Sequence, residues 1–187
     1  MQRISSYLKC AVAAVAASMV FLTPVLASED SELDALLEGL KTADIAGAAQ
    51  IQNRIYEIWS NSGSDAMDLL LARGREAMAE GDTRTAIEHF TALIDHAPDF
   101  AEGYNARATA YFQQGRYGLS LEDIRQTLAR NPSHFGALSG LALILEEIGK
   151  PEAALAAWRE VEKLNPTQEG LAEALVRLER QVEGSSL

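Results

Sequence analysis

The strongest constraint on the fold of this chain is a repeat with a period of 34 residues. Glycine and proline each return at that interval, with glycine at Gly81, Gly115 and Gly149 and proline at Pro98, Pro132 and Pro166. A period of this size is typical of arrays in which each unit packs only against its neighbours. The chain is therefore expected to fold as a stack of similar units.

Side-chain size follows the same period. Small residues recur at Gly74, Ala108 and Ala142 and at Ala86, Ser120 and Ala154, and large ones recur at Leu70, Tyr104 and Leu138 and at Phe90, Ile124 and Trp158. Small residues let two antiparallel helices approach closely, and large ones fill the space beside them. Glycine permits a tight turn, whereas proline ends a helix because it lacks an N–H group. An all-α fold follows.

These positions resemble the tetratricopeptide repeat, whose pattern is a large residue, a small one, an aromatic, then Ala-x-x-x-Phe and a closing proline. The resemblance covers three repeats, residues 65–98, 99–132 and 133–166. It implies a right-handed superhelix of antiparallel helix hairpins, with a concave groove lined mainly by the first helix of each repeat. Helices are expected over residues 65–79, 83–96, 101–113, 118–130, 135–148 and 152–164.

Local signals predict how these helices begin. Asp99 and Glu102 have the spacing of a capping box, and Ser133 and Thr167 can cap the helices that follow them. Pro151 suits a first helical turn.

Two further segments flank the repeats. Residues 28–64 are interpreted as a degenerate fourth hairpin, whose second helix Asp44 can cap. Its two halves carry apolar stripes, made of Leu33, Leu36, Leu37 and Leu40 and of Ile51, Ile55 and Trp59. Residues 167–187 are interpreted as a C-terminal capping helix, over 168–183, and a tail. The apolar face of that helix comprises Leu171, Leu175, Leu178 and Val182.

Residues 1–27 have the pattern of a secretory signal peptide, because Arg3 and Lys9 precede an apolar run that ends at Ala27. The mature chain is then expected to begin at Ser28. The alternative is a membrane anchor, but the run falls short of the roughly 20 strongly apolar residues that a spanning helix needs. Cleavage would remove Cys10, the only cysteine, and would leave no stable membrane insertion. A periplasmic location is expected.

The net charge and the absence of certain motifs exclude several classes of function. The net charge of −11 makes nucleic acid and anionic lipid poor partners, because both are bound through basic side chains. The sequence lacks the serine-hydrolase, P-loop and zinc-protease motifs. His89 and His96 hint at a metal pair, but zinc would need further ligands, and ordinary surface histidines are the alternative. His134 is interpreted as structural. No catalytic residue, metal site or cofactor is predicted.

A partner-binding groove is predicted on the first helices of the repeats. Its residues are Leu71, Arg75, Met78, Asn105, Thr109, Phe112, Ser139, Leu143 and Glu146. Four of them would form an apolar floor, with Phe112 as a binding hot spot, unless the N-terminal hairpin covers it. The Lys, Asn and Arg clamp that holds a C-terminal carboxylate in some eukaryotic relatives is largely absent.

An ion pair is predicted inside the second repeat. Arg107 occupies a position flanking the core, where the neighbouring repeats have Arg73 and Leu141. Asp123 lies beside Ile124 on the paired helix. Similar repeats with arginine in this position suggest that Arg107 and Asp123 meet.

Three functions are compatible with these features. The favoured hypothesis is a non-enzymatic adaptor in the periplasm that binds a cell-envelope protein or peptide in the groove. The alternatives are a structural or self-associating subunit of an envelope complex and a metal-dependent enzyme. The last would need a cofactor or a polar cluster that the sequence does not reveal.

Overall fold

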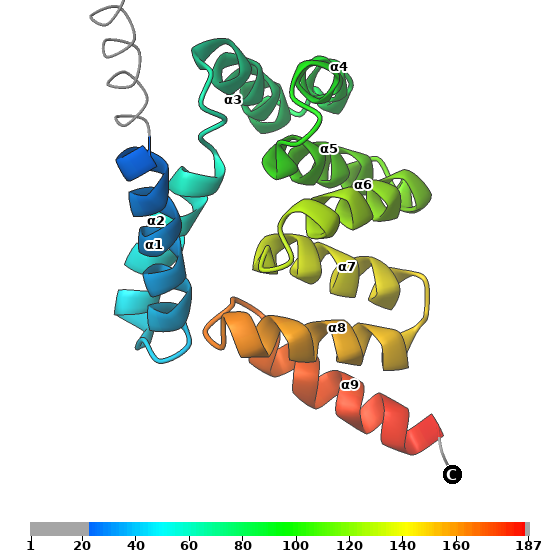
Figure 1. Ribbon diagram of the computed structural model, residues 1–187. Coiled ribbons are helices and arrows are strands. Elements are labelled where there is room, and N and C mark those ends of the chain that lie inside the picture. Colours follow the sequence, from blue (N-terminus) through cyan, green and yellow to red (C-terminus); the bar gives the residue numbers. More distant parts are fainter. Residues whose placement is uncertain (1–22, 186–187) are drawn as a thin grey trace, which may run out of the picture. The chain divides into compact units, whose positions relative to one another are not determined.

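The computed structural model describes residues 23–185, in which nine α-helices follow one another without a strand (Figure 1). They are α1 (Thr23–Leu40), α2 (Ile45–Trp59), α3 (Asp65–Ala79), α4 (Thr83–His96), α5 (Ala101–Gln113), α6 (Tyr117–Arg130), α7 (Phe135–Glu147), α8 (Pro151–Leu164) and α9 (Leu171–Ser185). The expected all-α fold is confirmed. Most of the expected signal peptide, residues 1–22, lies outside the described residues.

The chain divides into two units between Ala35 and Leu36, within α1. The unit from Leu36 onward contains α2 to α9 and is the one considered below. In it, α3 with α4, α5 with α6, and α7 with α8 form successive hairpins, and α9 packs on α8 (Figure 1). Over residues 23–185 no helix has the length and apolar character to cross a membrane.

The helices of the three repeats begin and end within one residue of their predicted bounds. Gly81, Gly115 and Gly149 have φ values of 82°, 69° and 69°, in the left-handed region that glycine adopts at low cost. After each glycine, the next backbone N–H bonds to a carbonyl five residues earlier, as Asp82 does to Ala77 at 2.9 Å. The repeated glycines thus close the first helix of each hairpin.

Several predicted helix caps are wrong. Asp99 does not cap α5, which begins after Phe100 without a side-chain cap, and Glu102 turns into the interior instead. Ser133 is displaced by His134, whose Nδ1 accepts the N–H of Ala137 at 3.1 Å. The other predicted caps have mixed outcomes: Asp44 caps α2 and Pro151 begins α8, but α9 starts at Leu171, beyond the reach of Thr167.

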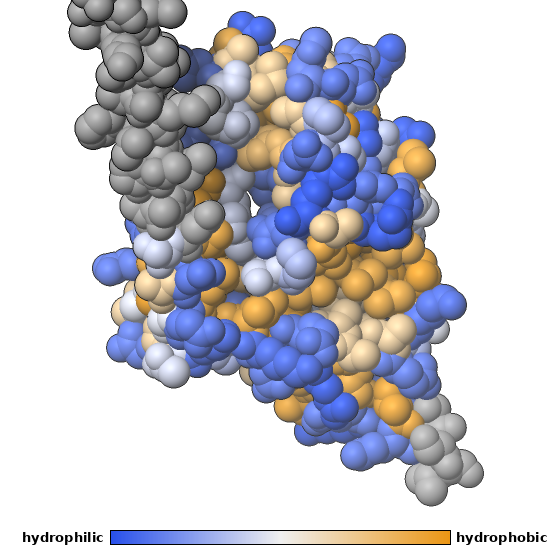
Figure 2. Space-filling view, in the orientation of Figure 1, coloured by the Kyte–Doolittle hydropathy of each residue, from blue (hydrophilic) through white to orange (hydrophobic). Residues whose placement is uncertain are grey.

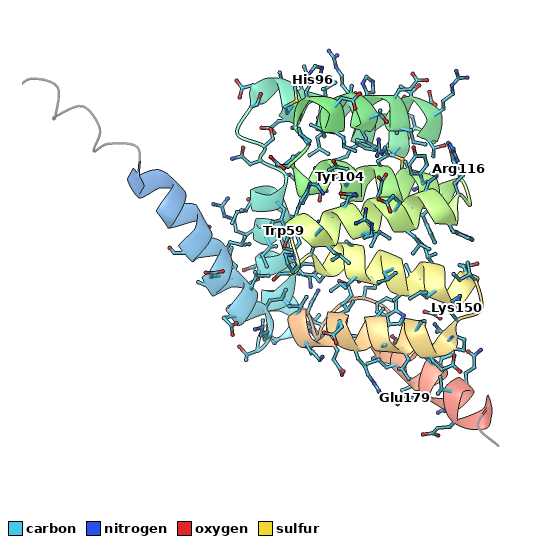
Figure 3. The ribbon with its side chains drawn as sticks, turned by 45° about the vertical axis from the view of Figure 1, so that its right-hand side comes forward. Trp59, His96, Tyr104, Arg116, Lys150 and Glu179 are labelled. Atoms are coloured by element: carbon cyan, nitrogen blue, oxygen red, sulfur yellow. The ribbon has the colours of Figure 1, made fainter. Side chains whose placement is uncertain are left out.

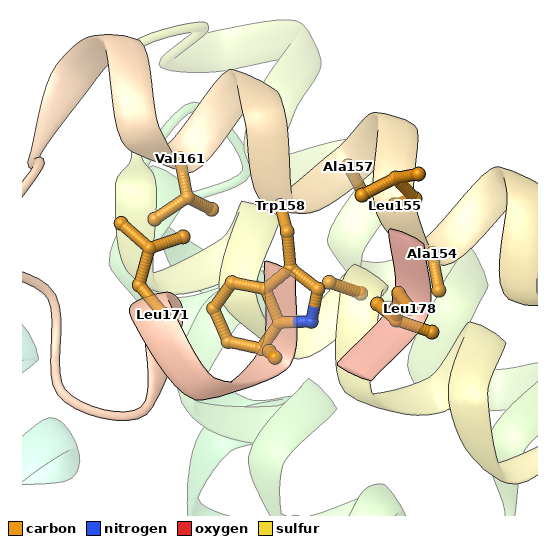
Figure 4. Packing of buried hydrophobic residues seen from close by; sticks show 9 residues of the cluster. Ala154, Leu155, Ala157, Trp158, Val161, Leu171 and Leu178 are labelled. Carbon is orange, nitrogen blue, oxygen red and sulfur yellow. The ribbon is translucent and has the colours of Figure 1, made fainter. Parts of the chain in front are cut away.

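The C-terminal helix completes the core at its end of the array. Leu171, Ala174 and Leu178 of α9 are buried with Trp158 and Val161 of α8 (Figure 4). Leu175 and Val182, the other two residues of the predicted apolar face, pack against this cluster. Without α9 the apolar face of α8 would meet water, so α9 acts as the predicted capping helix.

The predicted ion pair of the second repeat is confirmed. Arg107 donates from Nε and Nη2 to the two carboxylate oxygens of Asp123, both at 2.8 Å, and from Nη1 to Thr91 at 3.1 Å. The side chains of Arg107 and Asp123 are 17% and 5% exposed. The hydrogen bonds that Arg107 donates to the Asp123 carboxylate raise the pKa of Arg107 above its ordinary value. Arg73, the counterpart in the first repeat, is exposed and needs no such partner.

Candidate functional site

A pocket of about 390 Å³ opens between α5, α6 and α7. Five predicted groove residues line it, namely Asn105, Thr109 and Phe112 of α5 and Ser139 and Leu143 of α7. Ser120 and Ile124 of α6 and Gln168, between α8 and α9, also contribute. These residues of the second and third repeats thus surround one hollow, which we call the α5–α7 pocket.

Small residues account for the space in this pocket. Gly136 and Gly140 are one helical turn apart on α7 and both line it, as does Ala108 of α5. A methyl group at Gly140 would lie 3.5 Å from Cδ1 of Ile124, within ordinary contact distance. The missing side chain of Gly140 thus leaves room beside Ile124, whereas a methyl group at Gly136 would lie 3.1 Å from the Tyr56 hydroxyl.

Apolar atoms reach the surface beside this space. Leu143 is 42% exposed, although it lies in the middle of α7. Phe112 is half-buried, with its ring 5.6 Å from that of Tyr117, and packs against the cluster around Ile124. In the space-filling view, apolar surface gathers over the part of the array where α6 and α7 lie (Figure 2). Because Phe112 also supports the core, Leu143 is the cleaner reporter of binding.

The other predicted groove residues do not line the pocket. The prediction that Leu71 belongs to the groove is wrong, because Leu71 is only 2% exposed and belongs to the buried cluster of Phe90, Ala106 and Ala110. Met78 packs against the same cluster. Of the two charged residues, Arg75 pairs with Glu102, and Glu146 accepts hydrogen bonds from Trp158 and Arg177. The predicted groove residues of the first repeat and of the end of α7 therefore make other contacts and do not line the pocket.

A buried polar network lies next to the pocket. Glu102 is 4% exposed, and its carboxylate accepts hydrogen bonds from Arg75 at 2.5 Å, His134 at 3.0 Å and Asn105 at 3.1 Å. His134 Nδ1 accepts the N–H of Ala137, so the ring proton lies on Nε2, which donates to Glu102. These contacts join α3, α5 and α7 and fix the amide of Asn105.

The end of α2 packs on the start of α7. Trp59 lies on α2 (Figure 3), and its indole stacks on the His134 ring, with ring centroids 4.4 Å apart. The Tyr56 ring lies 5.3 Å from that of Phe135. Burial, and to a lesser extent the charge of Glu102, raises the pKa of Tyr56 to about 12. No α2 residue lines the pocket among those described. The alternative, in which the N-terminal hairpin covers the groove floor, therefore finds no support in the lining of this pocket.

These contacts predict that His134 links α2 to the repeats. His134→Ala removes the α7 cap, the bond to Glu102 and the surface on which Trp59 stacks, and is expected to lower the free energy of unfolding by about 2 kcal/mol. His134→Asn keeps a capping oxygen and should recover roughly half of that loss. Urea unfolding of both variants measures the difference. Equal stability of His134→Asn and the parent would show that the ring contacts contribute nothing.

Sequence reasoning named five of the side chains that line the pocket but missed the polar network beside it. Glu102 was assigned to a capping box, and its real partners, Arg75 and His134, lie 27 and 32 residues away along the chain. A glutamate among the small and apolar residues of α5 was the one available signal. Among residues 31–184, whose side chains are described, no three His, Cys, Asp or Glu residues are placed to hold a metal ion.

Comparisons with known proteins agree with this architecture. Residues 71–125 and 105–169 match the family model described as tetratricopeptide repeat. A TPR repeat-containing protein of Rhizobium etli is 35% identical over 159 residues, which cover 84% of this chain and 78% of that protein. The small glutamine-rich tetratricopeptide repeat-containing protein 2 of Saccharomyces cerevisiae is 32% identical over 114 residues, which are 61% of this chain and 33% of that protein.

Solved structures show the same fold at lower identity. The Sgt2 TPR domain from Aspergillus fumigatus matches with a TM-score of 0.61 and 23% identity, covering 66% of this chain and 83% of that one. The first TPR of Spaghetti (RPAP3), bound to the HSP90 peptide SRMEEVD, matches with a TM-score of 0.60 and 22% identity, covering 63% and 93%. At such identities the likeness concerns the fold.

Proposed function

Because the chain belongs to the tetratricopeptide-repeat family, whose repeats mediate protein–protein interactions, we propose that it is a non-enzymatic adaptor that holds a segment of a partner protein in the α5–α7 pocket. The observation that carries this proposal is the pocket itself, in which an exposed Leu143 and a half-buried Phe112 stand beside unoccupied space of about 390 Å³. Apolar side chains in a concave, partly polar site are typical anchors for a peptide. The peptide held by the first TPR of RPAP3 shows that this fold supports such binding.

The proposal also assigns the adaptor to a cellular compartment, the periplasm. The pattern of residues 1–27 supports export, with a mature N-terminus at Ser28 and a cell-envelope partner in the periplasm. A chain without cysteine after cleavage suits an oxidising compartment, because its folding needs no thiol chemistry. N-terminal sequencing of the protein from fractionated cells tests this part, and an intact Met1 in the periplasmic fraction would contradict it.

The binding role predicts different effects for two leucines of equal exposure. Leu143 in the pocket is 42% exposed, and Leu119 on α6, outside the pocket lining, is 41% exposed. Leu143→Gln is expected to reduce the partner recovered with the tagged protein from native envelope extracts about tenfold, because the loss of one apolar anchor costs more than about 1 kcal/mol of binding. Leu119→Gln should leave recovery unchanged.

Stability and association state serve as controls. Both substitutions replace a partly exposed leucine on a helix, so their effects on unfolding should be alike and small. Equal recovery with both variants would contradict the pocket assignment. Light scattering of the purified protein separates the adaptor from a self-associating subunit. An oligomer that forms with rising concentration and that Leu143→Gln dissociates would mean that the pocket binds a second copy of this chain.

A further inference from the structure

We propose, on the basis of the binding function above, that the α5–α7 pocket selects a segment with an apolar side chain flanked by basic or uncharged N–H donors, and rejects acidic segments. The first observation is the charge of the lining. None of the pocket residues carries a charge. A carboxylate that entered would lose its hydration and meet no cation, which is costly.

The second observation is how the polar groups of the walls are already used. The Asn105 amide donates through Nδ2 to Glu102 at 3.1 Å, so its Oδ1 is left as an acceptor. The hydroxyls of Thr109 and Ser139 donate to helix carbonyls, at 3.1 Å to Asn105 and at 2.9 Å to Phe135. Each hydroxyl oxygen keeps its lone pairs. The α5 and α7 walls therefore offer oxygen acceptors, which are satisfied by N–H donors.

The charged groups next to the pocket do not change the preference of its walls for N–H donors. Glu102, which holds Asn105, is paired with Arg75 and bonded by His134, so its carboxylate is already satisfied, and neither charged group lines the pocket. Arg177 pairs with Glu146 at the far end of α7. The long-range field comes from a chain with a net charge of −11, which attracts basic segments and repels acidic ones.

The remaining pocket residues indicate which chemical groups a bound segment carries. Phe112 and Leu143 provide apolar contact, and Gln113 and Gln168 stand beside them. The Gln168 side-chain oxygen accepts from Asn165 at 3.0 Å, which leaves its amide nitrogen as a donor for a backbone carbonyl. An extended or helical segment with one leucine, methionine or phenylalanine, and lysine or arginine near it, satisfies all of these groups.

Selection from a phage library of random dodecapeptides tests this assignment on the full-length protein. The Leu143→Gln variant serves for counter-selection, so that only pocket-dependent peptides remain. We expect the retained peptides to share an apolar residue and to carry several-fold more Lys and Arg, relative to Asp and Glu, than the starting library. Enrichment of acidic peptides or of a free carboxylate would overturn the assignment while leaving the binding function intact.

A positive charge added inside the pocket provides the second arm of the test. Thr109 is exposed and its hydroxyl bonds only to its own helix, so Thr109→Lys adds a cation without removing a tertiary contact. Fluorescence anisotropy with a synthetic selected peptide should show about tenfold weaker binding to Thr109→Lys than to the parent. Leu119→Lys, with the same added charge outside the pocket, should change affinity far less.

The outcomes separate the two proposals. Equal weakening by both lysine variants would mean that only net charge matters and would overturn selection by the pocket. If no peptide depends on Leu143, the binding function of the pocket fails, and the ligand assignment fails with it. Both proposals are supported if the parent binds basic peptides more tightly than acidic ones, and if Thr109→Lys weakens this binding while Leu119→Lys leaves it nearly unchanged.

Discussion

Gly74→Ala is expected to lower the free energy of unfolding by about 2–3 kcal/mol, although alanine is ordinarily the better helix former. A methyl group at Gly74 would lie 2.2 Å from Cε1 of Phe90 and 2.6 Å from Cδ1. The Phe90 ring is 1% exposed and packed in the cluster that joins the first and second repeats, so it has no free space into which to move. Denaturant unfolding monitored by circular dichroism measures the loss.

Gly140→Ala is the matched control for this prediction. The same methyl group at Gly140 meets Ile124 at 3.5 Å, which is an ordinary contact. The substitution should therefore raise the free energy of unfolding, by up to about 1 kcal/mol, because alanine loses less backbone entropy in a helix. Equal effects of the two substitutions would contradict the close helix approach in the first hairpin.

Asp123→Ala is expected to cost about 3 kcal/mol of stability, since it leaves the largely buried guanidinium of Arg107 without its carboxylate partner. The third repeat supplies the compensating change, because Leu141 and Ala157 occupy the positions of Arg107 and Asp123 there. The double variant with Arg107→Leu and Asp123→Ala gives the second repeat this apolar pair. It should lose much less than the sum of the two single losses.

A double-mutant cycle measured by urea unfolding decides this prediction. Arg107→Leu alone strands the carboxylate of Asp123, which is 5% exposed, and should also be strongly destabilising. Strong coupling between the two substitutions is expected because the groups bond to each other through two hydrogen bonds. Additive losses would show that the ion pair contributes little beyond the packing of each side chain.

Much of the fold was predictable because the repeat constrains each position three times. Glycine, proline and the small residues recur for reasons that are local to one hairpin, and the helix bounds follow from them. The Arg107–Asp123 pair was expected from the resemblance to repeats with arginine in the same position. Helix caps were predicted less well. Asp99 and Ser133 have suitable side chains, but tertiary partners decide the outcome, since His134 gains Glu102 and Trp59 when it caps α7.

The pocket was predictable only where the repeat has a neighbour on both sides. Asn105 and Ser139 occupy equivalent positions and both line it, whereas Leu71 in the first repeat is buried with Ala106 and Ala110 of α5. Packing of α2 on α7 breaks the symmetry further, through Tyr56 and Trp59. No period in the sequence relates α2 to α7, so this contact could not be read from the repeat.

The most direct test of partner binding in the α5–α7 pocket is a map of backbone amide chemical shifts in the isotope-labelled protein as a selected peptide is added. We expect the largest changes over residues 105–113 of α5 and 136–144 of α7, where the exposed apolar and acceptor groups lie. Leu143→Gln should abolish those changes at the same peptide concentration. Largest changes in α4 or α8, with α5 and α7 unaffected, would contradict a binding site in this pocket.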